Sequence, residues 1–176
     1  HREENVDNPN NLIRLIGVLN HLADRYKFPI IFSTHPRTKN RLDKLGLSTH
    51  ENIKFLKPFS FSDYIKLQIE AKCVMSDSGT ITEESSILNF PALNIREANE
   101  RPEGFEEGSV NMVGLNLELI DQTLKLLETQ PRGRDRLLRL VDDYSPKNVS
   151  EKVLRIIFSY TDFVNHRVWR KIEKSK

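Results

Sequence analysis

The stretch from Ser76 to Glu84 has the clearest chemical potential in the chain. It follows the apolar run Cys73–Met75, which predicts a buried strand, and precedes Ser85–Leu88, which predicts a helix. A small-residue turn at this position leaves backbone N–H groups unpaired at the helix start, where the positive end of the helix dipole also lies. Such donors favour a phosphate group. The pattern therefore indicates either a nucleotide site or simply a well-capped helix start.

Acidic and basic side chains accompany this turn. A carboxylate near the start of the helix can bind a ribose, because it can accept hydrogen bonds from two hydroxyl groups at once. Glu83 and Glu84 point about 100° apart on a helix, so we expect them to do different work. The charged segment Arg96–Gly104 follows the next apolar run, Ala92–Ile95. Ligands of open parallel sheets bind beyond the strand ends, which favours a shared site over solvated surface.

Composition predicts an ordinary soluble protein. The chain has 176 residues, 38% hydrophobic and 30% charged, enough for one domain with a core. No apolar run approaches the roughly 20 residues of a membrane span. Cys73, the single cysteine, cannot form an internal disulfide, which fits a cytoplasmic protein. No residues at metal-ligand spacing and no Gly-x-Gly-x-x-Gly motif occur, so we expect neither a metal nor another cofactor.

Charge is uneven along the chain. Residues 132–176 carry 12 Lys or Arg against 6 Asp or Glu. Because these charges are mixed and lie on helical patterns, we interpret them as solvated helix faces. We therefore expect neither nucleic acid nor a membrane as a partner.

Alternating strands and helices predict a parallel α/β sheet with crossover helices. The predicted strands are residues 29–33, 53–56, 73–75, 92–95 and 110–113. The predicted helices are residues 9–26, 39–45, 63–71 with Ser62 as cap, the segment after Gly79, 117–128, and patterns near 133–142, 148–160 and 162–172. The chain lacks an initiator Met and opens inside a motif, so we expect a piece of a longer protein, with a sixth strand just before His1.

Four motifs together resemble the non-hydrolysing UDP-N-acetylglucosamine 2-epimerases, in that family's order and spacing from residue 1 to about residue 114. The motifs are His1–Asn5, Thr34–Pro36, Ser76–Gly79 with Glu83-Glu84, and Glu100–Glu103. The longer string from Ser78 to Asn94 looks most like the branch that forms UDP-N-acetyl-L-fucosamine from a 6-deoxy-talose sugar nucleotide. Thr80 departs from the family, in which a second glycine is usual.

The resemblance implies a Rossmann-like parallel sheet with flanking helices, the C-terminal half of a two-domain GT-B-like fold. Residues 1–131 would then form the UDP-binding domain. Residues 132–176 would be helices that pack back on the absent N-terminal domain, with Trp169 on the docking face. A homodimer is one expectation for the full-length enzyme.

The reaction that the resemblance implies is an isomerisation. UDP leaves C1 of a UDP-2-acetamido sugar while the C2 proton is removed, and it adds back with C2 inverted. The carboxylates that move protons in this family lie in the absent half. We therefore expect this chain alone to bind weakly and to catalyse nothing.

Site roles also follow from the resemblance. His1 is the catalytic candidate. The UDP contacts would come from Ser78, Gly79 and Thr80 at the phosphates, Glu84 at the ribose, Tyr64 at the uracil, and Arg101 and Arg2. His35 would lie near a substrate or effector site. Structural alternatives stay open for three of these residues: Arg101 could pair with Glu100 or Glu103, Arg2 could form a structural pair, and Tyr64 could belong to the core.

Two other functions fit the same residues. One is half of a UDP-sugar glycosyltransferase with the same architecture. The other is a non-catalytic nucleotide-sugar-binding module. Formation of a 2-epimer without an acceptor would distinguish an epimerase from both.

Overall fold

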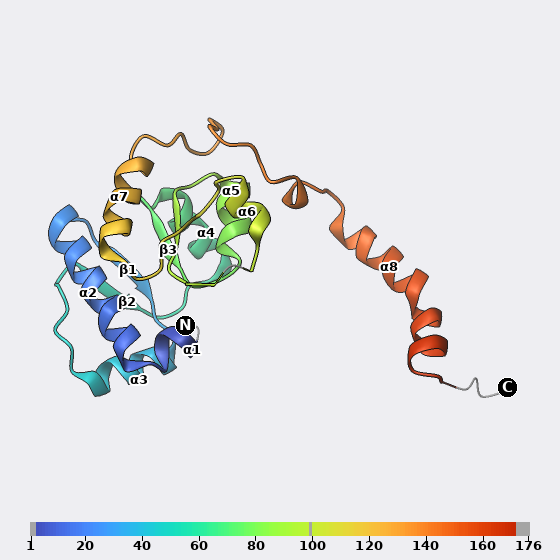
Figure 1. The fold of residues 1–176 in the computed structure, drawn as a ribbon, viewed down its shortest axis with the longest axis horizontal. Helices are drawn as coiled ribbons and strands as arrows, with labels where there is room; N and C mark the ends of the chain where they lie inside the picture. Colours follow the sequence, from blue (N-terminus) through green and yellow to red (C-terminus); the bar gives the residue numbers. More distant parts are fainter. Residues whose placement is uncertain (1–2, 99, 172–176) are drawn as a thin grey trace. The chain divides into compact units, whose positions relative to one another are not determined.

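Five short parallel strands form the sheets of the computed structural model, which describes residues 3–98 and 100–171 (Figure 1). They are β1 (Ile30–Ser33), β2 (Ile53–Leu56), β3 (Val74–Ser76), β4 (Ala92–Asn94) and β5 (Asn111–Met112). Among the described residues, β1 pairs with β2, and β3, β4 and β5 pair in that order. All pairs are parallel, with Ile30 opposite Ile53 and Val74 opposite Ala92. The predicted α/β class is confirmed.

Helices connect these strands. They are α1 (Glu3–Val6), α2 (Pro9–Tyr26), α3 (Pro36–Leu45), α4 (Phe61–Glu70), α5 (Ile81–Leu88), α6 (Pro102–Glu106) and α7 (Leu117–Leu127). The long helix α2 has the predicted bounds. Asn8 caps it by accepting from the Asn10 amide at 3.0 Å, and Pro9 occupies its first turn. Its buried face, including Leu12 and Ala23, forms the main core with β2, β4 and α7.

Two helices differ from the sequence prediction, one in its cap and one in its presence. Helix α4 begins at Phe61 with Ser60 as its cap, because the Ser60 hydroxyl, rather than that of Ser62, accepts from the Asp63 amide. The short helix α6, within the charged segment, was not predicted at all.

The helix predicted near residues 133–142 does not form; only a 3₁₀ turn at Asp142–Tyr144 is regular there. Gly133 has a φ of 61°, and the segment instead packs along α5. Arg136 donates to the carbonyls of Ser86 and Ile87 at 2.7 and 2.6 Å, and the Val141 amide donates to the Ser86 hydroxyl. Tertiary hydrogen bonds thus replace the helical ones.

The chain divides into two compact units, residues 1–144 and 145–176. The boundary expected after residue 131 therefore lies inside the first unit, and the change of unit follows Tyr144. The contacts of the 133–144 segment with α5 explain the difference.

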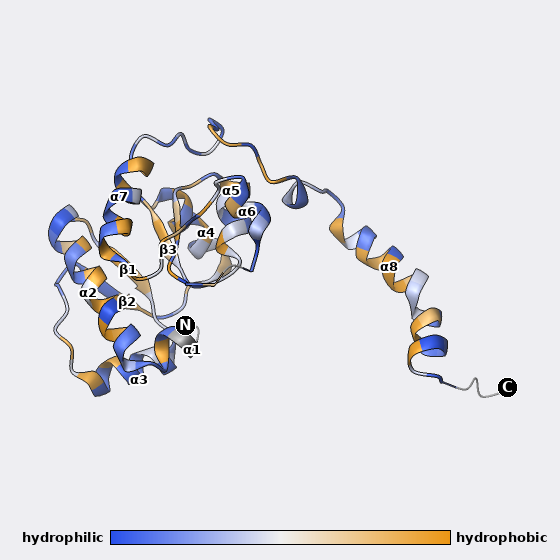
Figure 2. Cartoon of the chain, viewed as in Figure 1, coloured by the Kyte–Doolittle hydropathy of each residue, from blue (hydrophilic) through white to orange (hydrophobic). Residues whose placement is uncertain are grey.

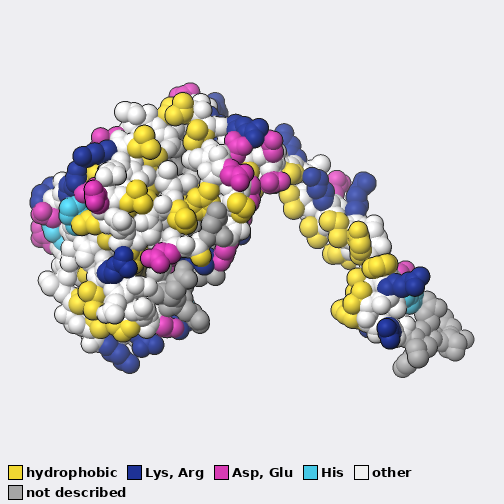
Figure 3. Space-filling model, viewed as in Figure 1, with side chains coloured by type: hydrophobic (Ala, Val, Ile, Leu, Met, Phe, Trp, Pro, Cys, Tyr) yellow, Lys and Arg dark blue, Asp and Glu magenta, His cyan; other side chains and the backbone are white. Residues whose placement is uncertain are grey.

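The described part of the second unit contains α8 (Val149–Phe163) and a π-helical continuation, Val164–Val168. Apolar side chains recur along α8 and are exposed (Figures 2 and 3); they include Val149, Val153, Ile156, Ile157, Tyr160 and Phe163. Trp169 is also exposed, with the Lys171 ammonium 4.4 Å from its ring centroid. Within the described ranges, no helix is long and apolar enough to cross a membrane.

Candidate functional site

The turn between β3 and α5 gathers hydroxyl groups at the start of a helix. The Ser76 hydroxyl accepts from the Ser78 amide at 3.0 Å. The Ser78 and Thr80 hydroxyl oxygens lie 3.0 Å apart, and Thr80 makes no capping bond with its side chain. Two hydroxyls therefore stand where the helix dipole is positive, an arrangement that suits a phosphate.

Arg101 closes over Gly79 in this turn. A β-carbon at Gly79 would lie 2.1 Å from Nη1 of Arg101, so only glycine admits the guanidinium there. The Arg101 Nε donates to Glu83 Oε1 at 2.6 Å, and Nη1 lies 3.8 Å from Glu100 Oε2. The expected alternative partners were Glu100 and Glu103. The pair with Glu100 is present, and Glu83, which was not among the expected partners, is nearer; the structural pairs and the approach to the turn therefore coexist.

The Glu103 carboxylate has a different partner. It accepts from the Tyr144 hydroxyl at 2.6 Å. This hydrogen bond is the largest cause that lowers the pKa of Glu103 below its usual range. Burial, and then the bond to Glu103, raises the pKa of Tyr144.

Glu84, next to Glu83, lies in a second cluster with Gln68 and Tyr64 of α4. The Gln68 amide donates to Glu84 Oε2. Burial raises the pKa of the Tyr64 hydroxyl, and the charge of Glu84 adds to this effect. The two glutamates thus have separate partners, as their positions on the helix predict.

Gln68 was missed by sequence reasoning. It is 2% exposed, and its Oε1 has no hydrogen-bond partner among the described residues. Its spacing of four residues from Tyr64 places the two on one helix face, which is the signal that could have identified it.

The remaining predicted residues stand apart from these contacts. His35 caps α3, because its Nδ1 accepts from the Arg37 amide at 3.2 Å. His1 and Arg2 lie outside the described residues. Asp77, which was given no role, accepts from Asn5 Nδ2 at 3.3 Å and so ties the start of the chain to the turn.

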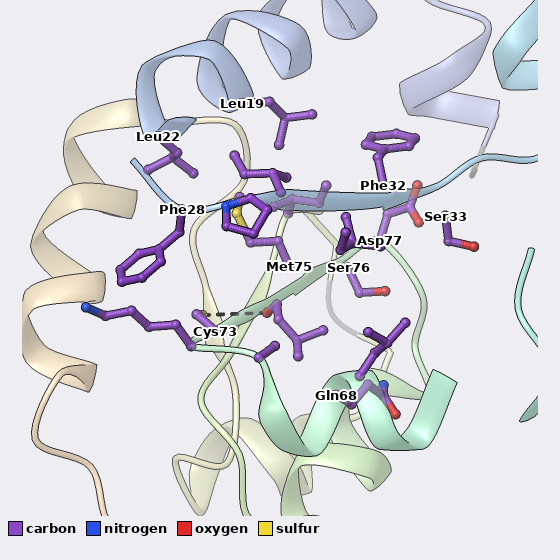
Figure 4. A pocket seen from close by; sticks show the side chains of 18 of the residues that line it. Leu19, Leu22, Phe28, Phe32, Ser33, Gln68, Cys73, Met75, Ser76 and Asp77 are labelled. Carbon is purple, nitrogen blue, oxygen red and sulfur yellow. Dashed lines mark hydrogen bonds between the residues drawn. The ribbon is translucent and has the colours of Figure 1, made fainter. Parts of the chain in front are cut away.

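A cavity of about 740 Å³ reaches one side of the turn (Figure 4). Its lining is mainly apolar and comes from β1, β3, α2 and α4. It includes Ser76, Asp77 and Ser78 but not Gly79 or Arg101. The cavity is therefore distinct from the position in which a phosphate would meet Arg101. Among the described residues, no cluster of three potential metal ligands is present.

Comparisons with known proteins point to one family. The sequence profile of the UDP-N-acetylglucosamine 2-epimerases matches residues 1–158. A protein of that name from Methanocaldococcus jannaschii is 34% identical over 137 residues, which cover 76% of this chain and 37% of that protein. One from Methanococcus maripaludis is 36% identical over 68% of this chain and 34% of that protein.

Solved structures agree. A UDP-N-acetylglucosamine 2-epimerase from Rickettsia bellii is 50% identical with a TM-score of 0.80, covering 92% of this chain and 44% of that one. The M. jannaschii enzyme in complex with UDP-GlcNAc and UDP is 30% identical, also with a TM-score of 0.80, covering 90% of this chain and 43% of that one. This chain spans less than half the length of these relatives. Because the family profile matches residues 1–158, the chain belongs to the UDP-N-acetylglucosamine 2-epimerase family.

Proposed function

We propose that this chain is the UDP-binding part of an enzyme that inverts C2 of a UDP-2-acetamido sugar. One observation carries the proposal: Arg101 closes over Gly79 beside the Ser78 and Thr80 hydroxyls at a helix start. The family match adds support, because a relative has been solved with UDP-GlcNAc and UDP.

The proposed reaction proceeds by elimination and re-addition. The C1–O bond breaks, and its electron pair leaves with UDP. A base removes the C2 proton, and a C1–C2 double bond forms. UDP then adds back to C1 while C2 is protonated on the opposite face, so the atoms balance without a cofactor.

Leaving-group stabilisation is the task of this chain in that reaction. Negative charge develops on the pyrophosphate as the C1–O bond breaks. The hydroxyls of Ser78 and Thr80, the amides of the turn and the Arg101 guanidinium would stabilise that charge. Glu83 offsets part of the Arg101 charge but fixes its position, so the donors are oriented before the bond breaks.

Nucleoside recognition falls to the second cluster. Glu84 would accept hydrogen bonds from the ribose hydroxyls. Gln68 would set the orientation of Glu84, because the Gln68 side-chain amide donates a hydrogen bond to one of its carboxylate oxygens. Tyr64 would lie beside the uracil ring.

Proton transfer requires groups beyond the described residues. We assign His1 to the reaction centre and Arg2 to a phosphate contact. The acid–base carboxylates would come from an N-terminal domain, on which the exposed apolar face of α8 and Trp169 would pack. His35 is proposed near a substrate or effector site, where its capping role would also position it.

The substrate can be proposed more finely. The string from Ser78 to Asn94 favours the branch that forms UDP-N-acetyl-L-fucosamine. Its substrate would be a 6-deoxy-talose sugar nucleotide rather than UDP-N-acetylglucosamine. We propose a homodimer for the full-length enzyme.

The test is incubation of the full-length protein with each UDP-amino sugar, without any acceptor, followed by NMR of the C2 configuration. A 2-epimer from UDP-N-acetylglucosamine or from the 6-deoxy-talose sugar nucleotide supports the proposed reaction. The one of these two substrates that is converted faster identifies the branch. Binding of UDP with no epimer from any UDP-2-acetamido sugar would favour a transferase or a binding module instead.

A further inference from the structure

The Glu100 carboxylate lies against the same turn as the Arg101 guanidinium. A β-carbon at Gly79 would lie 3.1 Å from Glu100 Oε2 and 2.1 Å from Arg101 Nη1. Gly79 comes shortly before Ile81, the first residue of α5, where the positive end of the helix dipole favours an anion. The turn to which we assign a phosphate therefore already faces a negative charge of the protein itself.

Two arginines hold this carboxylate. Arg96 Nη1 lies 2.7 Å from Glu100 Oε1, and the Arg96 side chain is only 9% exposed. Arg101 Nη1 lies 3.8 Å from the other carboxylate oxygen, Oε2. The shorter contact comes from the buried arginine, so Glu100 is anchored on Arg96 while its Oε2 faces the turn.

The charges around the turn balance one another. The Arg101 Nε donates to Glu83 Oε1 at 2.6 Å, on the side of the guanidinium that does not face Glu100. The linked side chains are Arg96, Glu100, Arg101 and Glu83. These four side chains carry two positive and two negative charges. A phosphate at the turn thus gains hydrogen bonds from the donors, but additional negative charge on that phosphate meets no net positive charge in this cluster.

Pyrophosphate ligands differ in the charge that they bring to such a site. In a UDP-sugar the terminal phosphate is esterified and carries one negative charge. In free UDP the terminal phosphate can lose a second proton with a pKa of about 6, as other phosphate monoesters do, so it is close to doubly charged at neutral pH. The charge on the terminal phosphate therefore distinguishes the two ligands.

We propose that Glu100 is a specificity-determining residue, which lowers the affinity of the turn for free UDP relative to UDP that is esterified at its terminal phosphate. The inference rests on the proposed UDP site. A unit charge about 6 Å from a carboxylate, at an effective dielectric constant of about 40, is disfavoured by about tenfold, or about 1.4 kcal/mol. The second charge of the terminal phosphate is subject to this repulsion, and the esterified phosphate lacks that charge.

This repulsion has a consequence for the proposed reaction. When the C1–O bond breaks, the esterified terminal phosphate becomes the doubly charged phosphate of bound UDP. A site that bound UDP much more tightly than the sugar nucleotide would stop at UDP and the unsaturated sugar, because tight binding of an intermediate deepens the well from which it must react. Glu100 narrows the difference between the two affinities and so favours re-addition of UDP to C1.

A matched pair of ligands tests the charge effect. UDP and its β-methyl ester differ by one methyl group and one ionisable oxygen. At pH 8, Glu100→Gln in the full-length protein should raise the affinity for UDP about tenfold more than the affinity for the methyl ester, as measured by titration calorimetry. Glutamine keeps an oxygen that can accept from Arg96, so the substitution removes the charge and retains that contact. Glu106→Gln, at an exposed position of α6, is the control and should raise both affinities equally.

The pH dependence separates a charge effect from a structural one. At pH 5 the terminal phosphate of UDP is mostly singly charged, because its second pKa is about 6. Glu100→Gln should then change the affinities for UDP and for the methyl ester by the same factor. Equal changes at pH 8 as well would show a structural role and overturn the proposal. Weaker binding of UDP by Glu100→Gln at pH 8 would also overturn it, because the carboxylate would then assist the phosphate contact.

The Ser78→Ala variant distinguishes failure of this inference from failure of the proposed site. If Ser78→Ala leaves the affinity for UDP unchanged, the phosphates lie elsewhere, and both the site and the role of Glu100 are wrong. If Ser78→Ala weakens UDP binding and Glu100→Gln gives no difference between the two ligands, the site stands and only the role of Glu100 is overturned. Uridine, which has no phosphate, should bind equally to the parent protein and to Glu100→Gln; a tenfold gain for uridine would also contradict the charge effect.

Discussion

Gly79 and Arg101 form one unit: a β-carbon on the glycine would lie 2.1 Å from the Nη1 of the arginine. The obstructed atom is the end of a flexible side chain, so a larger residue at position 79 would displace the guanidinium rather than the backbone. The Glu83 carboxylate holds the other side of the same guanidinium. A larger residue at position 79 would therefore move the positive charge of Arg101 more than it would destabilise the fold.

Gly79→Ala in the full-length protein should weaken UDP binding by about tenfold, or about 1.4 kcal/mol, because the charged hydrogen bond from Arg101 is misplaced. The measurement is titration calorimetry with UDP. Gly17→Ala is the control, since nothing lies within 4 Å of a β-carbon at that position. Unchanged affinity at position 79 would exclude Arg101 from the UDP site.

Ser78→Ala should weaken UDP binding by about 1–3 kcal/mol, the usual cost when a charged group loses a hydrogen-bond partner. Ser62→Ala, at an exposed position of α4, should leave the affinity unchanged. Calorimetry on both folded variants decides the matter; an unchanged Ser78→Ala would remove that hydroxyl from the phosphate contacts.

The two adjacent glutamates allow a matched comparison. Glu84→Gln should reduce discrimination between UDP and 2′-deoxy-UDP, because an amide holds the ribose hydroxyls less well than a carboxylate. Glu83→Gln should keep that discrimination but weaken UDP binding overall, because it releases Arg101. Competition binding with the two nucleotides measures both. The same loss of discrimination in both variants would indicate a general distortion of α5 instead of a ribose contact.

Local signals explain how much of the fold was predictable. The bounds of α2 follow from the Asn8 cap, Pro9 and a regular apolar stripe, all contained in one segment. The segment near residues 133–142 has comparable apolar spacing, but its hydrogen bonds go to α5, and nothing within the segment indicates this.

The site shows the same limit. The turn at Ser78 is a continuous pattern and was predictable. Arg101 and Glu83 are 18 positions apart in the chain. From charge alone, several acidic residues could have been the ion-pair partner of Arg101, so the sequence did not identify Glu83. For Gln68, the spacing from Tyr64 was the one local signal; its partner Glu84 lies on another helix, and a glutamine on a helix ordinarily faces water.

His1→Asn in the full-length enzyme should lower turnover by about 10²–10⁴-fold, the range for a positioned proton-transfer group. UDP affinity should fall much less, because the turn at Ser78 remains. Steady-state kinetics with calorimetry separates the two effects, and His35→Asn serves as a comparison at another motif histidine. Full turnover in His1→Asn would return this residue to a structural role. The 176-residue chain alone should give no epimer, since proximity cannot be supplied by absent groups.

The hydrogen bond between Glu103 and Tyr144 should make stability depend on pH. The bond lowers the pKa of Glu103, so its stabilisation is present above the unfolded pKa near 4.5 and is lost as pH falls through the lower folded value. The pKa of Tyr144 is raised, so its contribution is present below the unfolded pKa near 10 and is lost as pH rises through the higher folded value. Tyr144→Phe should therefore destabilise most between about pH 5 and 9 and progressively less outside that window. Urea unfolding across the pH range measures this difference, with Tyr160→Phe on α8 as the control. A destabilisation by Tyr144→Phe that stays constant from pH 3 to pH 8 would show that packing, and not the bond to Glu103, ties the 133–144 segment to α6.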